Sequence, residues 1–141
     1  MVERADGRVI AIAHDLDRQY YREGMRLHRT LFANALARLL TDPMVTAELP
    51  SMGRLNLLHQ PEQRRYVAHL TYGSPIQRGS VRVIEDIVPL RDVEVTVSLP
   101  EEVERAYLIP AMEEVELTER DGRLAVTIPE LEMHAGLVLE Y

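Results

Sequence analysis

Residues 26–49 read RLHRTLFANALARLLTDPMVTAEL, and this stretch contains the change of pattern that decides the fold. Up to Thr41 the large apolar residues recur three or four positions apart, which is the spacing of one helix face. Asp42-Pro43 ends this pattern, because the residue before a proline is pushed out of the helical region. After Pro43 apolar and polar residues alternate, as in half-buried strands. The sequence therefore predicts a segment of one strand and one long helix, residues 1–43, followed by a β domain, residues 44–141.

The predicted helix, from about Arg26 to Thr41, carries two adjoining rows of apolar residues. One row consists of Leu27, Leu31, Ala35 and Leu39, and the other of Phe32, Leu36 and Leu40. Two rows make a wide stripe, which must lie against a substantial surface. The interface candidates on this stripe are Leu27, Leu31, Phe32, Ala35 and Leu39.

A short strand and a helical turn are expected before that helix. Val9–Ala13 is β-branched and apolar, which suits a strand covered on both faces in a parallel sheet. Asp15 follows this strand and can cap the next turn, and residues 16–21 can form a short helical turn that Gly24 interrupts. A unit of this kind needs neighbouring strands, and none of that type follows. We therefore expect residues 1–43 to be the remnant of a larger α/β domain.

Strand candidates follow Pro43 at regular spacing, with turn residues between them. They are Val45–Leu49, Arg54–Gln60, Arg65–Tyr72, Val93–Leu99, Glu102–Ile109, Glu114–Thr118, Arg123–Ile128 and Leu131–Leu139. Short strands at this spacing predict an antiparallel β-sandwich. The fold expected for the whole chain is thus mainly β, α+β overall, with one strand and one long amphipathic helix before the sandwich.

Three strand pairs or faces can be specified further. A four-residue connection over residues 61–64 would set Gln60 opposite Arg65 and make one face of that hairpin apolar. Asp121-Gly122 between two alternating runs is a strong hairpin signal, because glycine accepts the positive φ of the turn. With Gln60 opposite Arg65, the further pairs of that hairpin are Leu55 with Leu70, Leu57 with Ala68, His59 with Tyr66, and Asn56 with His69. In the last strand the alternation places Leu131, Met133, Ala135, Leu137 and Leu139 on one face.

Composition excludes several classes of chemistry. The chain has no cysteine and no lysine, so it lacks thiolate nucleophiles, thiolate metal sites and Schiff-base chemistry. Residues 1–43 carry seven arginines against six acidic residues, and residues 44–141 carry nine against seventeen. An acidic second segment without a basic stripe argues against nucleic acid and anionic membranes as partners.

The candidate ligand-binding residues are His14, Asp15, Tyr20 and Tyr21. His14 and Asp15 follow a strand, and the carboxyl ends of strands in open α/β sheets are where ligands bind. A helix-cap role for Asp15 and a surface role for His14 are the simpler alternative. These two tyrosines, together with Tyr72, could contribute edges to a sugar-binding surface.

Other polar residues are expected to be structural. The five histidines show no metal-ligand spacing, so we expect no metal site. The glutamates at 101–104 and 113–116 alternate with apolar positions, which is typical of the solvated face of a sandwich, and Arg91-Asp92 is expected to be a local ion pair.

Several short motifs carry a resemblance to a known family. In the first segment they are Asp15 after a strand, Tyr20-Tyr21 near Gly24, and the run His28-Arg29-Thr30-Leu31-Phe32-Ala33-Asn34-Ala35; in the second they are His69-Leu70-Thr71-Tyr72, residues 87–93 and the last strand. In this order they resemble the C-terminal end of multidomain glycoside hydrolases of the β-galactosidase and α-fucosidase-like type. Those enzymes carry a glutamine-amidotransferase-like, flavodoxin-like "β-galactosidase trimerisation" domain after a catalytic (β/α)₈ barrel, and then a small β domain.

The resemblance implies an accessory role rather than catalysis. A (β/α)₈ barrel takes about 250 residues, and the catalytic acid and nucleophile of the family lie in that barrel, so no catalytic residue is carried over. The expected function is domain packing or subunit association within a glycoside-hydrolase-like protein, through the helix stripe and without a cofactor. A free-standing dimerisation module and a weak carbohydrate-binding module are the alternatives. With no apolar stretch of the roughly 18 residues that a membrane span needs, and no signal peptide, we expect a cytoplasmic protein.

Overall fold

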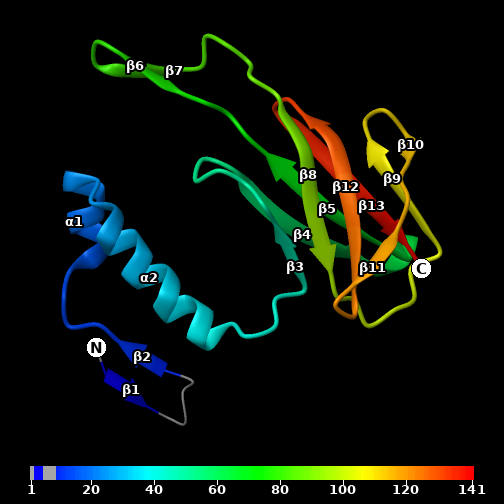
Figure 1. Ribbon diagram of the computed structural model, residues 1–141, viewed down its shortest axis with the longest axis horizontal. Coiled ribbons are helices and arrows are strands. Elements are labelled where there is room, and N and C mark those ends of the chain that lie inside the picture. Colours follow the sequence, from blue (N-terminus) through cyan, green and yellow to red (C-terminus); the bar gives the residue numbers. More distant parts are fainter. Residues whose placement is uncertain (1, 5–8) are drawn as a thin grey trace. The chain divides into compact units, whose positions relative to one another are not determined.

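The computed structural model describes residues 2–4 and 9–141, and the chain divides into two compact units, Met1–Pro43 and Met44–Tyr141 (Figure 1). The first contains strands β1 (Val2–Arg4) and β2 (Val9–Ala11) and helices α1 (Leu16–Glu23) and α2 (Arg26–Leu39).

The strand expected in a parallel sheet is shorter than predicted and pairs differently. β2 ends at Ala11 and pairs antiparallel with β1, with Arg4 opposite Val9. Val9 is half exposed, so this strand is not covered on both faces. The apolar run predicted the strand itself, but a nearby segment of the same chain satisfies its hydrogen bonds.

The two helices begin and end close to the predicted positions. Gly24 closes α1 in the left-handed conformation, with φ 65°, and its N–H donates to the carbonyl of Tyr20. This conformation is easily accessible to glycine. α2 ends at Leu39, before Asp42-Pro43. The predicted cap is wrong, because the Asp15 side chain makes no cap hydrogen bond and instead accepts one from Nε of Arg18.

The second unit is an antiparallel β-sandwich, as predicted (Figure 1). One sheet has the strand order β10-β9-β13-β5-β4 and the other the order β11-β12-β8-β3. The bounds are β3 Val45–Ala47, β4 Arg54–Gln60, β5 Arg65–Thr71, β8 Leu90–Val97, β9 Arg105–Ile109, β10 Glu113–Glu114, β11 Thr118–Arg120, β12 Arg123–Leu131 and β13 His134–Glu140.

Alternating residues of both sheets meet in one apolar core. Leu70, Val95, Ile128, Leu131, Leu137 and Leu139 are among its fully buried members. A smaller apolar cluster lies on the other face of the five-stranded sheet and consists of Val67, Tyr107 and Val138, with Ile109 packed against it.

The β4–β5 hairpin has the predicted register. Gln60 pairs with Arg65, Leu57 with Ala68 and Leu55 with Leu70, and a 3-10 turn at Pro61–Gln63 joins the strands. The Asp121-Gly122 hairpin is also confirmed, because Arg120 of β11 pairs with Arg123 of β12. In both cases the turn length and the alternation fix the same register.

The strand predicted at Glu114–Thr118 is wrong. β10 pairs with β9 in one sheet, whereas β11 pairs with β12 in the other. The segment between them passes from sheet to sheet, and Val115 and Leu117 pack partly buried against the core. Their alternation comes from this packing and not from strand pairing.

The strand predicted at Leu131–Leu139 is in fact two strands. β12 continues to Leu131, and β13 begins at His134 in the other sheet. Met133 lies between them and is 46% exposed, so it does not share the buried face of Ala135 and Leu137.

Asp92 and Pro129 mark a distortion of the β8–β12 pair. Asp92 has a φ of 52°, which aspartate tolerates better than most residues, and Pro129 has no N–H to donate. The predicted Arg91–Asp92 ion pair is wrong, because Arg91 forms an ion pair with Glu130, its partner across the strands.

An additional hairpin between β5 and β8 was not predicted. It consists of β6 (Ile76–Arg78) and β7 (Val81–Val83), and it extends away from the two sheets (Figure 1). Four predicted strands have shifted ends: β3 ends before Leu49, β5 before Tyr72 and β8 before Leu99, and β9 begins after Glu102.

Candidate functional site

The apolar face of α2, formed by Leu27, Leu31, Phe32, Leu36 and Leu39, is largely exposed. Leu27 is 69% exposed and Phe32 58%, whereas Ala35, another of the interface candidates, is 6% exposed. Large apolar side chains gathered on one helix face are typical of an interaction surface. The sequence predicted this stripe, and the structure shows which of its members are accessible.

The four candidate ligand residues lie at and within α1. His14 shares a hydrogen bond of 2.9 Å between its Nε2 and Oε1 of Gln19. The hydrogen bond from Arg18 lowers the pKa of the Asp15 carboxyl below its usual value. Both polar groups thus have local partners on the helix. Tyr20 and Tyr21 are 40% and 91% exposed and follow each other along α1.

A polar and aromatic cluster closes one end of the sandwich core. His59 stacks on Tyr66, with ring centroids 4.1 Å apart, and its Nε2 lies 2.9 Å from Oη of Tyr141. The Tyr66 hydroxyl donates to Glu101 over 2.9 Å. Burial, together with the neighbouring Glu101 carboxylate, raises the pKa of Tyr66 to about 12. A buried phenol that holds its proton this firmly acts as a structural hydrogen-bond donor and is a poor general base near neutral pH.

The sequence did not predict the contact between His69 and His134. Nδ1 of His69 lies 3.0 Å from Nε2 of His134, on the neighbouring strands β5 and β13. The prediction that His69 lies opposite Asn56 and points away from His59 is correct. His134 lies beside His69 because β13 pairs with β5. The two residues are far apart in the sequence, and their spacing does not predict that these strands pair.

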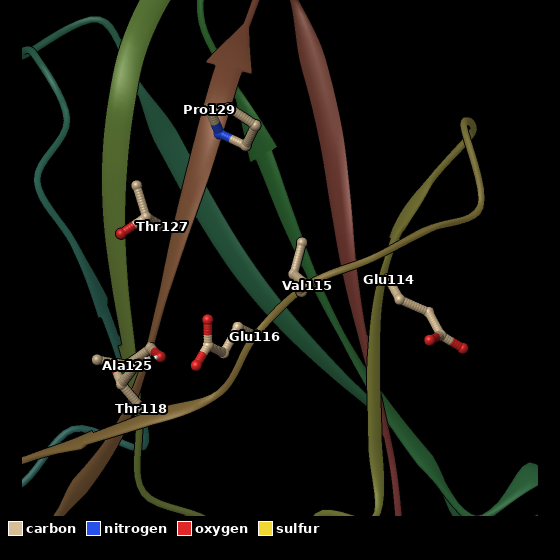
Figure 2. A pocket seen from close by; sticks show the side chains of 7 residues that line it. All are labelled: Glu114, Val115, Glu116, Thr118, Ala125, Thr127 and Pro129. Carbon is tan, nitrogen blue, oxygen red and sulfur yellow. Dashed lines mark hydrogen bonds between the residues drawn. The ribbon is translucent and has the colours of Figure 1, made fainter.

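A groove lies between β12 and the segment that connects β10 with β11 (Figure 2). Its volume is about 340 Å³, and its lining consists of Glu114, Val115, Glu116, Thr118, Ala125, Thr127 and Pro129. Figure 2 shows the Glu114 side chain extending away from β12, and Glu114 forms an ion pair of 2.9 Å with Arg105. The groove therefore offers one carboxylate, that of Glu116, beside two threonine hydroxyls, and no aromatic ring on which a sugar could stack.

Within residues 2–4 and 9–141, no three histidine, aspartate or glutamate side chains gather into a group that could hold a metal ion. Neither of the two helices found in those residues is long and apolar enough to cross a membrane.

Comparisons with known proteins find similar solved structures. No protein-family model matches the chain, and no curated protein matches it either. A cycloisomaltooligosaccharide glucanotransferase from Paenibacillus sp. matches 76% of this chain and 19% of its own, at 17% identity and a TM-score of 0.44. α-L-Fucosidase isoenzyme 2 from Paenibacillus thiaminolyticus matches 92% of this chain, at 40% identity and a TM-score of 0.85. The chain is thus similar over nearly its whole length to a part of an α-L-fucosidase, and it spans 20% of that enzyme's length.

Proposed function

We propose that this chain is a non-catalytic accessory part of an α-L-fucosidase-like glycoside hydrolase, serving domain packing or subunit association. The observation that carries the proposal is the 40% identity to one fifth of a fucosidase chain. The carboxylates also support it. Glu94, Glu114 and Glu130 each form an ion pair with an arginine on the sheet surfaces, whereas glycosidases place two carboxylates across a cleft.

The apolar face of α2 is the proposed contact surface. Fully burying one leucine or phenylalanine side chain stabilises a protein by about 1.5–3 kcal/mol, and five such residues share this face. The remainder of a fucosidase-like enzyme would supply the missing surface, either within one subunit or between subunits.

For residues 1–43 we propose, more specifically, that β2, α1 and α2 correspond to the end of a glutamine-amidotransferase-like domain. The strand-then-helix order supports this assignment, whereas the antiparallel pairing of β2 with β1 is unlike a parallel flavodoxin-like sheet.

A second candidate function is self-association of a free-standing module. The exposure of Leu27 and Phe32 favours it equally, since a second copy could cover the same face. Sedimentation of the chain at low micromolar concentration tests this candidate. A dimer that the substitution Phe32→Glu converts to a monomer would support it.

A domain exchange tests the leading proposal. The part of the P. thiaminolyticus fucosidase that matches this chain is deleted in one variant and replaced by residues 1–141 in another. We expect the deletion to lose assembly and activity, and the exchange to restore both with an unchanged KM for an aryl α-L-fucoside. An exchange that carries Phe32→Glu should assemble poorly.

Two results would contradict the proposal. Hydrolysis of the aryl fucoside by the isolated chain would show that it is catalytic. Full activity and unchanged assembly of the deletion variant would show that this part has no role in packing or association.

A further inference from the structure

The backbone groups of β4 that face away from β5 follow from the hydrogen bonds at both ends of β5. The N–H of Tyr141 donates to the carbonyl of Arg64, and the N–H of Tyr72 donates to the carbonyl of Met133. Backbone groups alternate in direction along a strand, so the even-numbered residues of β5 face β13 and the odd-numbered ones face β4. Their partners on β4, which face β5 in return, are Arg54, Asn56, Leu58 and Gln60.

Leu55, Leu57 and His59 therefore direct their backbone N–H and C=O groups to the open side of β4. Within residues 44–141 no other strand lies along this side, and none of the backbone hydrogen bonds outside the strands ends on these three residues. Three donors and three acceptors thus stand in a row, at a spacing of about 6.8 Å for every second residue. Such a row is a template for one more strand.

The part of the chain around this edge is basic, in contrast to the rest of the second unit. Residues 49–84 carry five arginines against one acidic residue, whereas residues 44–48 and 85–141 carry four against sixteen. Arg54 lies at one end of β4, and Arg65 lies beside Gln60 at the other end. Pairing of β4 with a second copy of itself would place one basic edge against another. The charges therefore favour an acidic partner strand over self-pairing.

From these observations we propose that β4 binds an extended acidic segment of a partner protein, which joins the five-stranded sheet as an additional antiparallel strand. Main-chain hydrogen bonds to Leu55, Leu57 and His59 hold the segment, as in other cases of strand addition. Leu55 and Leu57 pack partly buried against the core, so the residues of the segment opposite them are apolar. The intervening residues of the segment lie on the outer face, where acidic side chains meet Arg54 at one end and Arg65 at the other.

NMR titration of the full chain with the acetylated and amidated peptide EEVTVTVEE tests the proposal. We expect one bound peptide per chain, with shifts of the backbone amide signals of Leu55, Leu57 and His59 and slower exchange of their amide hydrogens. N-methylation of the central valine, which pairs with Leu57, should weaken binding about tenfold, because a main-chain donor is lost. N-methylation of a neighbouring threonine, whose N–H faces away from β4, is the matched control and should leave the affinity unchanged.

The charge requirement is tested separately. A peptide with lysine in place of every glutamate should not bind at low salt. Arg54→Gln should weaken binding of the acidic peptide about threefold, as expected for an exposed ion pair. Arg120→Gln is the matched control, because it removes the same charge from β11 in the other sheet, and it should bind like the parent.

The proposal is overturned if the acidic peptide shifts no signals, if the shifts occur away from β4, or if N-methylation has the same effect at both positions. Equal binding of the lysine peptide would overturn the acidic partner, as would equal affinities of Arg54→Gln and Arg120→Gln. Circular dichroism checks that both protein variants are folded. Should either variant unfold, the modified peptides decide alone, because they leave the protein unchanged.

Discussion

The two units of the chain differ in how they bury apolar side chains. In residues 44–141 two sheets enclose a continuous core, in which Ile128, Leu131 and Leu137 have no exposed surface. In residues 9–43 the buried apolar residues are Leu16 and Ala35, while Leu27 and Phe32 remain more than half exposed. The β-sandwich therefore derives its stability from its own residues. The helical unit presents apolar surface that its own residues leave uncovered, and helices in proteins owe most of their stability to packing of such a face.

The largest loss of unfolding free energy is expected from Leu137→Ala in the sandwich core, and it would confirm the contrast between the two units. Removing a fully buried leucine side chain leaves a cavity and costs about 2–5 kcal/mol of unfolding free energy. Urea unfolding, followed by circular dichroism in the β-sheet region, measures the loss. A cost below about 1 kcal/mol would mean that the core is not closely packed around this residue.

A smaller loss is expected from Gly136→Ala, which tests how closely β13 and β9 pack. A Cβ at this position would lie 2.5 Å from Cγ1 of Ile109. Overpacking of this kind costs about 1–3 kcal/mol. The same substitution made in an Ile109→Ala background should cost less, because the opposing atoms are gone. Equal costs in both backgrounds would contradict the proposed clash.

Tyr66→Phe should cost about 1 kcal/mol at neutral pH, because it removes the hydroxyl that donates to Glu101. The pKa of Tyr66 is about 12 in the folded chain, above the ordinary value of 10.0. The unfolded chain therefore loses this proton first as the pH rises, and stability falls from about pH 10 to about pH 12. The midpoint of urea unfolding over this range should fall more steeply for the parent than for Tyr66→Phe. Parallel pH profiles would contradict the assignment.

The smallest effect is expected from Leu27→Ala, the counterpart of Leu137→Ala in the helical unit. Leu27 is 69% exposed, so its truncation should change the unfolding free energy by no more than about 0.5 kcal/mol. Any effect should appear instead in association, measured by sedimentation. A stability loss as large as that of Leu137→Ala would show that the chain covers this face by itself.

The β-sandwich could be predicted in most of its parts, and the successes have a common cause. At Gln60 and Arg65 the loop length and the alternation of the flanking strands agree, and only one register satisfies both. The errors occur where the alternation has another origin. Val115 and Leu117 alternate because they lie in the segment that crosses between the sheets and pack against the core. The β6–β7 hairpin with its Gly79-Ser80 turn was not predicted, because its strands are too short to show a clear period.

The sites were less predictable than the fold. Leu27 and Phe32 could be assigned to an apolar face from helix spacing, since both lie on one element. The meeting of His69 with His134 depends on the pairing of β5 with β13, which are separated by more than sixty residues. Single-sequence periodicity contains no information on which distant strands pair, so this cluster needed the structure.

The crossing segment between β10 and β11 also affects how the sandwich meets other molecules. β10 and β11 are the outermost strands of their sheets on one side, and β4 and β3 are the outermost strands on the other, where residues 48–53 join them. On each side a single run of chain thus links the two sheet edges. β3, β10 and β11 have three residues or fewer, and strands this short offer little backbone for edge-to-edge aggregation. β4, with seven residues, is the long edge strand, so an incoming peptide that pairs with a free edge would do so along β4 and extend the five-stranded sheet.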